Sequence, residues 1–117
     1  MKPTACRSLV EFLDIYPTVA ELCGLTVPST VTGKSLRPIL DDPARTVHDS
    51  VLTHITRGPN VSGFGLRTDR WRYIEWSDGS AELYDHDGDP EEWHNVATEA
   101  AHSKTLAEMK AQLAARR

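Results

Sequence analysis

The sequence contains little cysteine and no long apolar run. Cys6 and Cys23 are its two cysteines in 117 residues, too few for the disulfide framework of a small secreted domain. We predict two buried free thiols, with one bridge as the alternative. No apolar run approaches the roughly 20 residues of a membrane-spanning helix. No apolar signal-peptide core follows Met1 and Lys2. We therefore expect no membrane partner.

Basic clusters are also absent. The chain has 13 Lys and Arg against 17 Asp and Glu, a net charge of −4, with both signs spread along its length. Nucleic-acid-binding surfaces instead gather Lys and Arg on one face, so we expect no nucleic-acid partner. The apolar (39%) and charged (26%) fractions are typical of a globular protein. The length predicts one domain over residues 1–117.

The N-terminal half predicts one short helix. A helix that began well before Asp14 would place Pro17 in its interior, where the ring clashes with the preceding turn. We therefore predict an extended lead-in over 8–13 and a helix over about 15–23. Asp14 would be its N-cap, Pro17 would lie in its first turn, and Gly24 would end it in a left-handed conformation.

The remainder predicts a long loop, a sheet and a final helix. Residues 25–50 read as a connecting loop with one helical turn at 36–40. Four segments have the β-branched and aromatic content of strands: VLTHIT (51–56), GFGLRT (63–68), RWRYIEW (70–76) and AELYD (81–85). Asp78-Gly79 predicts a type I′ hairpin turn. The spacing of Leu106, Met109 and Leu113 predicts an amphipathic helix laid on the sheet. The expected fold is α+β: a roughly four-stranded antiparallel sheet packed by a C-terminal helix, with a short N-terminal helix and a long connecting loop.

The acidic stretch ELYDHDGDPEEWHNVA (82–97) raises the question of a metal site. An EF-hand loop from Asp85 would need Gly at position six and Glu at twelve, where the chain has Pro90 and Val96. His86 and His94 show no zinc-binding spacing. We predict no metal site here. The stretch reads instead as a strand end and a turn, with Trp93 packed back onto the sheet.

Catalytic residues are not evident. The chain has no nucleophile with a base and an orienting group, no P-loop and no GxSxG. The loop TRGPNVSGFG (56–65) is the segment most suited to face a ligand. Arg57, Asn60 and Arg67 lie in or beside this loop, and each could equally be an ordinary surface residue. His54, in the middle of a predicted strand, reads as a core or sheet-end histidine.

The order of several motifs resembles a known family. FLDIYPTVAELCGL is followed by GKSLRPIL, LRTDRWRYIEW, ELYDHDGDPEEWHNVA and a closing helix. Over residues 1–115 this order is similar to the C-terminal portion of type I sulfatases, in the iduronate-2-sulfatase and choline-sulfatase-like branch of the alkaline phosphatase superfamily. The DxxPT motif occurs across that superfamily, whereas the combination R-T-x-x-W-R-Y-I with E-L-Y-D-x-x-x-D-P-x-E-x-x-N is specific to sulfatases.

The resemblance implies a subdomain that is catalytically incomplete alone. Sulfatases carry C/S-x-P-x-R, whose Cys or Ser becomes formylglycine, and neither Cys6 nor Cys23 lies in that motif. The family's calcium site also lies upstream. Residues 1–117 would therefore support an N-terminal catalytic domain and form part of the pocket wall for a sulfated carbohydrate or other sulfate ester. His54, Arg57, Asn60 and Arg67 would be its substrate contacts.

Two alternatives follow from the same residues. The chain could be a free-standing α+β interaction module derived from a sulfatase, or a fragment of a related phosphodiesterase or phosphonate hydrolase. In the absence of a catalytic domain we expect an exposed apolar patch and homo-oligomer formation. Relatives are often periplasmic, secreted or lysosomal, and the sequence does not select a compartment.

Overall fold

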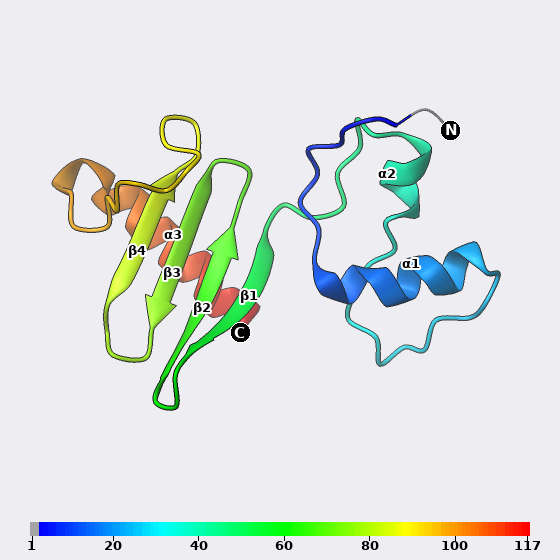
Figure 1. Cartoon of the computed structure of the whole chain (residues 1–117), viewed down its shortest axis with the longest axis horizontal. Coiled ribbons are helices and arrows are strands. Elements are labelled where there is room, and N and C mark those ends of the chain that lie inside the picture. Colours follow the sequence, from blue (N-terminus) through cyan, green and yellow to red (C-terminus); the bar gives the residue numbers. More distant parts are fainter. Residues whose placement is uncertain (1–2) are drawn as a thin grey trace. The chain divides into compact units, whose positions relative to one another are not determined.

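The computed structural model describes residues 3–117, in two compact units divided after Val51 (Figure 1). The first unit contains η1 (Phe12–Asp14), α1 (Ile15–Leu22) and α2 (Arg37–Asp41). The second begins within β1 (Val51–Arg57), at Leu52, and also contains β2 (Val61–Arg67), β3 (Trp71–Trp76), β4 (Ala81–Asp85), η2 (Ala100–His102) and α3 (Ser103–Arg116). Within residues 3–117 no helix has the length and apolarity needed to cross a membrane.

Helix α1 ends as the sequence predicts. Pro17 is its third residue, where a missing N–H leaves no hydrogen bond unmade. Gly24 has a φ of 69° and donates to the carbonyl of Glu21 at 3.0 Å. The N–H of Leu25 donates to the carbonyl of Ala20 at 2.8 Å. This pair of bonds is a Schellman motif, and it requires the left-handed conformation that glycine adopts readily.

The start of α1 differs from the prediction. Asp14 precedes the helix, but its side chain makes no capping hydrogen bond to α1. Its carboxylate instead accepts the N–H of Glu11 at 2.7 Å and the N–H of Lys34 at 2.9 Å. The bond to Glu11 closes the 3₁₀ turn η1, so the lead-in over 8–13 is not extended throughout.

The DxxPT motif attaches the following loop to α1. Thr18 is buried, and its hydroxyl accepts the N–H of Leu36 at 2.8 Å. Together, Asp14 and Thr18 bind both ends of the segment 34–36, which leads directly into the single helical turn α2. The predicted turn near 36–40 is thus confirmed.

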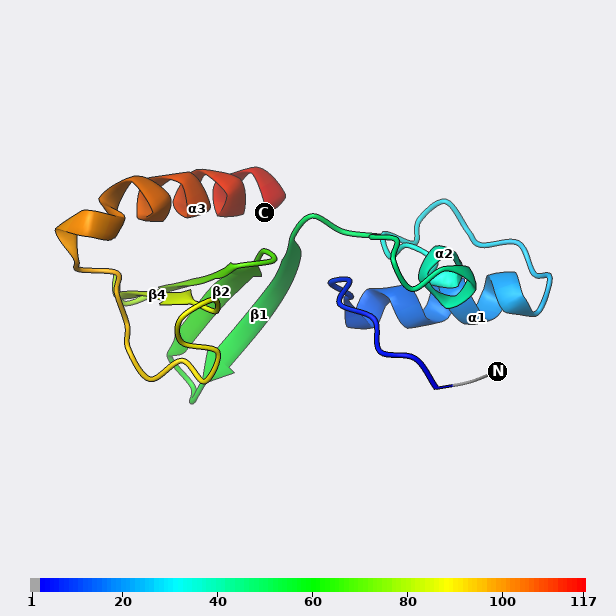
Figure 2. The ribbon, with the colours of Figure 1, turned by 90° about the horizontal axis from the view of Figure 1, so that it is seen from above.

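The second unit is a four-stranded sheet in the order β1-β2-β3-β4, covered on one face by α3 (Figure 2). Its register pairs Gly65 with Ile74 and Tyr73 with Leu83. Five residues form the buried core between sheet and helix: Leu66, Tyr73, Leu83, Met109 and Leu113. The predicted α+β fold is confirmed, including the sheet, the C-terminal helix and the short N-terminal helix.

The β3–β4 turn is at the predicted place but of another type. Gly79 has a φ of 87°, whereas Asp78 does not have the positive φ of a type I′ turn. The N–H of Gly79 donates to the carbonyl of Trp76, and the N–H of Trp76 donates to the carbonyl of Ser80. This is a three-residue loop with a glycine bulge. Ala81 therefore pairs with Glu75, one position away from the type I′ register. Such a shift decides which face each β4 side chain occupies.

The cysteine prediction is half wrong. Cys6 and Cys23 are free thiols, but both are exposed. Cys23 directly follows α1, and the Sγ of Cys6 donates to the carbonyl of Pro43 at 3.3 Å. Neither side chain contributes to a buried core.

Gly33 provides a test of the first unit. A Cβ at this position would overlap the Leu13 carbonyl, whereas a Cβ at Gly88 would meet no atom within 4 Å. We expect Gly33→Ala to lower the free energy of unfolding by about 1–3 kcal/mol, the usual cost of overpacking. Gly88→Ala is the matched control and should change it by less than about 0.5 kcal/mol. Urea unfolding followed by circular dichroism measures both, and equal stability of the two variants would contradict this account.

Candidate functional site

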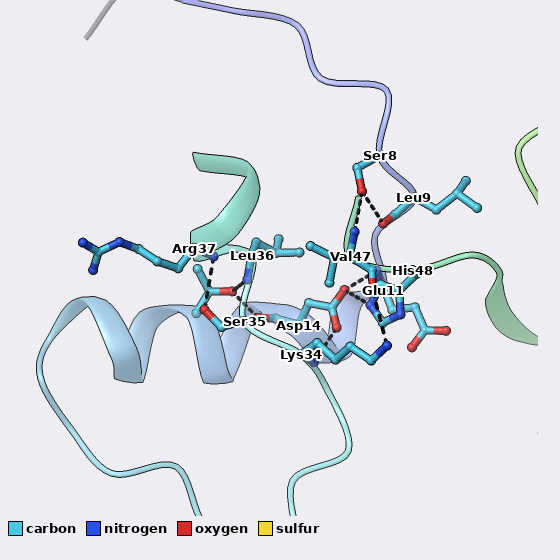
Figure 3. A network of polar contacts seen from close by, with 11 residues as sticks. Ser8, Leu9, Glu11, Asp14, Lys34, Ser35, Leu36, Arg37, Val47 and His48 are labelled. Carbon is cyan, nitrogen blue, oxygen red and sulfur yellow. Dashed lines mark hydrogen bonds and ion pairs between the residues drawn. The ribbon is translucent and has the colours of Figure 1, made fainter. Parts of the chain in front are cut away.

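The first polar cluster surrounds Asp14 in the N-terminal unit (Figure 3). Asp14 is fully buried, and His48 is almost so. His48 Nε2 lies 2.9 Å from Asp14 Oδ2. Burial alone would raise the pKa of Asp14, but the N–H groups of Glu11 and Lys34, together with His48, hold that pKa below its usual value. Asp14 is therefore a buried carboxylate stabilised by convergent donors.

Glu11, Asp14 and His48 are also of types that bind metal ions, and one potential ligand atom from each lies within 4.8 Å of the others. Both Asp14 oxygens already accept N–H donors: Oδ1 from Lys34, and Oδ2 from Glu11 and His48. A metal ion would have to displace these bonds. His48 also forms a backbone bridge with Leu9. The cluster thus fastens the segments around 9, 34 and 48 to the start of α1.

The four predicted substrate-binding residues do not lie together. His54 stacks on Phe64, with ring centroids 4.6 Å apart, and Phe64 packs against the core beneath α3. Arg57 lies over Trp76 on the opposite face. The register places Arg67 opposite Arg72, on that same face. Asn60 is exposed in the β1–β2 turn. Arg57 and Arg67 thus share the face opposite α3, but Arg57 lies beside the β1–β2 turn and Arg67 at the far end of β2; His54 lies on the face beneath α3.

Arg57 rests on an aromatic surface. Its guanidinium carbon lies 4.0 Å from the centroid of the Trp76 ring, within the range of a cation–π contact. Its Nη1 is 3.8 Å from Glu82 Oε1, and its side chain remains 64% exposed. Trp76 itself is only 5% exposed. A cation is thereby held over a buried ring with its donor edge accessible to solvent.

Glu82 organises the side chains next to Arg57. Its Oε1 accepts the indole N–H of Trp76 at 2.8 Å, and its Oε2 accepts the hydroxyl of Tyr84 at 2.9 Å. Burial and the hydrogen bond to Glu82 raise the pKa of Tyr84 to about 12. Tyr84 therefore remains a hydroxyl donor at neutral pH, and both carboxylate oxygens of Glu82 are engaged.

Arg67 is the second arginine of this face. Its Nη1 is buried and has no hydrogen-bond partner within residues 3–117. Burial lowers the pKa of Arg67, while Glu92 and Asp69 act in the opposite direction. Arg72, its cross-strand neighbour, is instead paired with Glu92 at 2.7 Å. Of these two adjacent arginines, Arg67 is the one that keeps hydrogen-bonding capacity.

The acidic stretch 82–97 is structural, as its turn residues predict. Asp85 accepts two hydrogen bonds from Arg70, at 2.7 and 2.6 Å. Glu92 contacts Arg72 at 2.7 Å and His86 at 2.6 Å. Asp89 accepts the N–H groups of residues 93 and 94. Each of these carboxylates holds the chain that follows β4 in place.

The predicted packing of Trp93 onto the sheet is wrong. Trp93 is 79% exposed. The preceding residue, Glu92, adopts a φ of 60°, which is uncommon for a residue with a Cβ. The ion pair with Arg72 makes Glu92, rather than Trp93, the group that anchors this loop to β3.

Comparison with known proteins identifies the family. Residues 1–117 match the family model of the C-terminal region of N-sulphoglucosamine sulphohydrolase. The chain belongs to this sulfatase family. Arylsulfatase K of Rattus norvegicus is 38% identical over 103 residues, which are 79% of this chain and 18% of the relative. The chain thus spans about a fifth of the length of the curated relatives that it matches.

Solved structures agree. A sulfatase structure from Bacteroides thetaiotaomicron matches this chain with a TM-score of 0.78 and 32% identity. The match covers 86% of this chain and 23% of the chain in that structure. A second, solved with its substrate D-glucosamine-2-N,6-O-disulfate, has a TM-score of 0.80 and 27% identity. This second match covers 88% of this chain and 23% of the chain in that structure. The resemblance to the C-terminal portion of sulfatases, inferred from the motifs, is therefore confirmed, and the chain is a sulfatase C-terminal domain.

Sequence reasoning missed the residues that accompany Arg57. Trp76 and Glu82 lie on different strands and meet because β3 and β4 pair in one particular register. One residue in the sequence, Gly63, does indicate the place of the Trp76 ring, because a Cβ at this position would lie 2.6 Å from that ring. A glycine within a strand often marks such a close approach.

Acid unfolding tests the Asp14 cluster. A carboxylate with a lowered folded-state pKa adds stability above its unfolded value of about 3.9, and this stability is lost as pH falls through the folded value. We expect Asp14→Asn to lower the free energy of unfolding at pH 7 by about 3 kcal/mol, since it leaves buried donors poorly paired. The variant should also lose less stability than the wild type below about pH 4.

Urea unfolding at several pH values between about 3 and 7 measures this difference. Asp41→Asn is the matched control, because Asp41 is exposed and its carboxylate pairs with Arg37 on its own helix. Stability curves of Asp14→Asn and wild type that run parallel across this range would contradict the account.

Proposed function

We propose that this chain is the C-terminal subdomain of a longer sulfatase, the parent enzyme, which hydrolyses a sulfate ester. The subdomain supports the catalytic domain, forms part of the wall of the substrate pocket and is catalytically incomplete alone. The match of residues 1–117 to a sulfatase C-terminal family carries this proposal. It favours a sulfatase over the alternatives of a phosphonate hydrolase fragment and a free-standing interaction module.

The chemistry of sulfate-ester cleavage supports the division of labour. The reaction needs an activated nucleophile and a cation that stabilises charge on the oxygens of the transferred sulfuryl group. Neither Cys6 nor Cys23 lies in a C/S-x-P-x-R sequence. In the parent enzyme, formylglycine would supply the nucleophile and calcium the cation, both from its N-terminal catalytic domain.

The substrate wall is assigned to the face of the sheet that α3 leaves uncovered. Arg57 offers exposed guanidinium donors there, Arg67 adds a buried Nη1 that has no hydrogen-bond partner within residues 3–117, and guanidinium groups suit oxyanions. Asn60 would contribute from the adjacent turn. His54 keeps a place among the candidate contacts, although its stacking on Phe64 supports a packing role. A sulfated carbohydrate fits this set, as does another sulfate ester.

The surface for the catalytic domain is an apolar stripe along η1 and α1. Its members are spaced three and four residues apart and are each more than half exposed: Phe12, Ile15, Tyr16, Val19 and Leu22. Exposed apolar patches of this kind mark protein interfaces. We assign the stripe to the N-terminal catalytic domain of the parent, because the family members are about five times as long as this chain.

An activity assay tests the catalytic part of the proposal. The 117-residue chain should show no turnover of an aryl sulfate at neutral pH, with or without calcium, because it holds no activated nucleophile. The upstream reading frame of its gene should encode C/S-x-P-x-R in phase. Measurable turnover that Cys6→Ala abolishes would refute the proposal.

Size-exclusion chromatography with light scattering tests the apolar stripe. We expect the chain alone to form homo-oligomers as its concentration rises, since the stripe has no catalytic domain to cover it. Val19→Glu should shift it to a monomer, because a charge inside an apolar interface is costly. Glu21→Lys, at an exposed position of α1 outside the stripe, is the control and should still associate. A wild-type monomer at high concentration would count against this assignment.

A further inference from the structure

The guanidinium of Arg57 is stacked on Trp76, and among residues 3–117 its N–H groups keep hydrogen-bonding capacity. Trp76 supports one flat side of the guanidinium at 4.0 Å from the ring centroid. The 3.8 Å separation from Glu82 Oε1 is longer than a hydrogen bond. Glu82 therefore attracts Arg57 without using its N–H groups. A side chain that is 64% exposed would otherwise sample many rotamers, and ordering it in advance reduces the entropy lost on binding.

We propose that Arg57 recognises the sulfate group of a sulfated sugar, and that Trp76 and Glu82 are its positioning residues. Stacking on Trp76 sets the plane of the guanidinium, and Glu82 acts through Trp76 by accepting its indole N–H. The inference rests on the proposed substrate-wall role of this face and adds to it the ligand group and the two residues that prepare Arg57. Guanidinium groups match the tetrahedral oxyanion through two parallel N–H bonds.

The positions of Trp76 and Glu82 are themselves determined by the fold. The Trp76 ring lies against Gly63, where any side chain would collide with it. Its indole N–H donates to Glu82, and the hydroxyl of Tyr84 holds the second oxygen of the same carboxylate. The platform is therefore built before a ligand arrives, as a specific recognition site requires.

The negative charge of Glu82 has a cost for anion binding. Glu82 holds the Trp76 indole through a bond that an amide oxygen can also make, but its charge repels an incoming sulfate at close range. Glu82→Gln retains an oxygen that can accept the Trp76 N–H and removes the charge. If Arg57 binds sulfate, this variant should bind more tightly. If Arg57 only shields the Trp76 ring from water, the substitution should leave anion binding unchanged.

The experiment is a titration of the 117-residue chain with glucosamine 6-sulfate, followed by the NMR signal of the Trp76 indole N–H. Unsulfated glucosamine is the ligand control, and inorganic sulfate separates recognition of the anion from recognition of the sugar. We expect saturable shifts with the sulfated sugar and with sulfate, and none with glucosamine. Glu82→Gln should lower the dissociation constant about threefold or more, as removal of a nearby like charge predicts.

Substitutions of arginine complete the test. Arg57→Ala should weaken binding about tenfold or more, and Arg57→Lys by less, because lysine keeps the charge but loses the planar fork. Arg70→Ala is the matched control: Arg70 is similarly exposed, but its donors are engaged by Asp85. The Arg70→Ala variant should bind the sulfated sugar with the same affinity as the wild type. Dispersed amide signals would show that each variant remains folded.

Three results would overturn the inference: no saturable shift with either sulfate probe, equal binding by Arg57→Ala and wild type, or unchanged or weaker binding by Glu82→Gln. The titration requires no turnover. Its failure therefore leaves the sulfatase assignment standing, whereas turnover by the isolated chain would refute the claim that it is catalytically incomplete alone, without affecting the sulfate contact.

Discussion

The packing of α3 on one face of the sheet is the interaction on which the C-terminal unit depends. Met109 and Leu113 bury the side chains of Leu66, Tyr73 and Leu83, and burial of such side chains contributes about 1.5–3 kcal/mol each. Because this face supplies the core, the opposite face is free to carry arginines, a buried indole and an engaged glutamate. The separation of a structural face from a polar face makes a recognition surface possible on so small a sheet.

The N-terminal unit divides its residues in a comparable way. Asp14 and Thr18 use their polar groups internally, so that the loop after α1 is bound to the helix without a large apolar core. The apolar residues of η1 and α1 are turned outward instead. Polar groups inside and apolar groups outside are unfavourable for an isolated protein. The same arrangement suits a segment whose outer surface is covered by a larger domain.

Most of the fold could be predicted from local patterns, whereas the errors depended on distant partners. The strands, α3 and the left-handed Gly24 follow from spacing and from backbone restrictions. The role of Asp14 depended on Lys34 and His48, which no local pattern brings near it. Asp78-Gly79 fits two turn types, and only the packing of β4 selects one. The loop after β1 identified Arg57 as a candidate. The contact between Trp76 and Glu82, however, could be found only once the register of β3 with β4 was known.

A crystal structure of the parent enzyme bound to a sulfated sugar would test the central claim most directly, namely that this segment supplies support and recognition while catalysis comes from elsewhere. The account predicts that the attacking group and its cation come from outside residues 1–117, that the stripe from Phe12 to Leu22 is covered by the catalytic domain, and that Arg57 donates to the sulfate. A reacting centre built from the side chains of these residues, or an Arg57 remote from the bound ester, would contradict it.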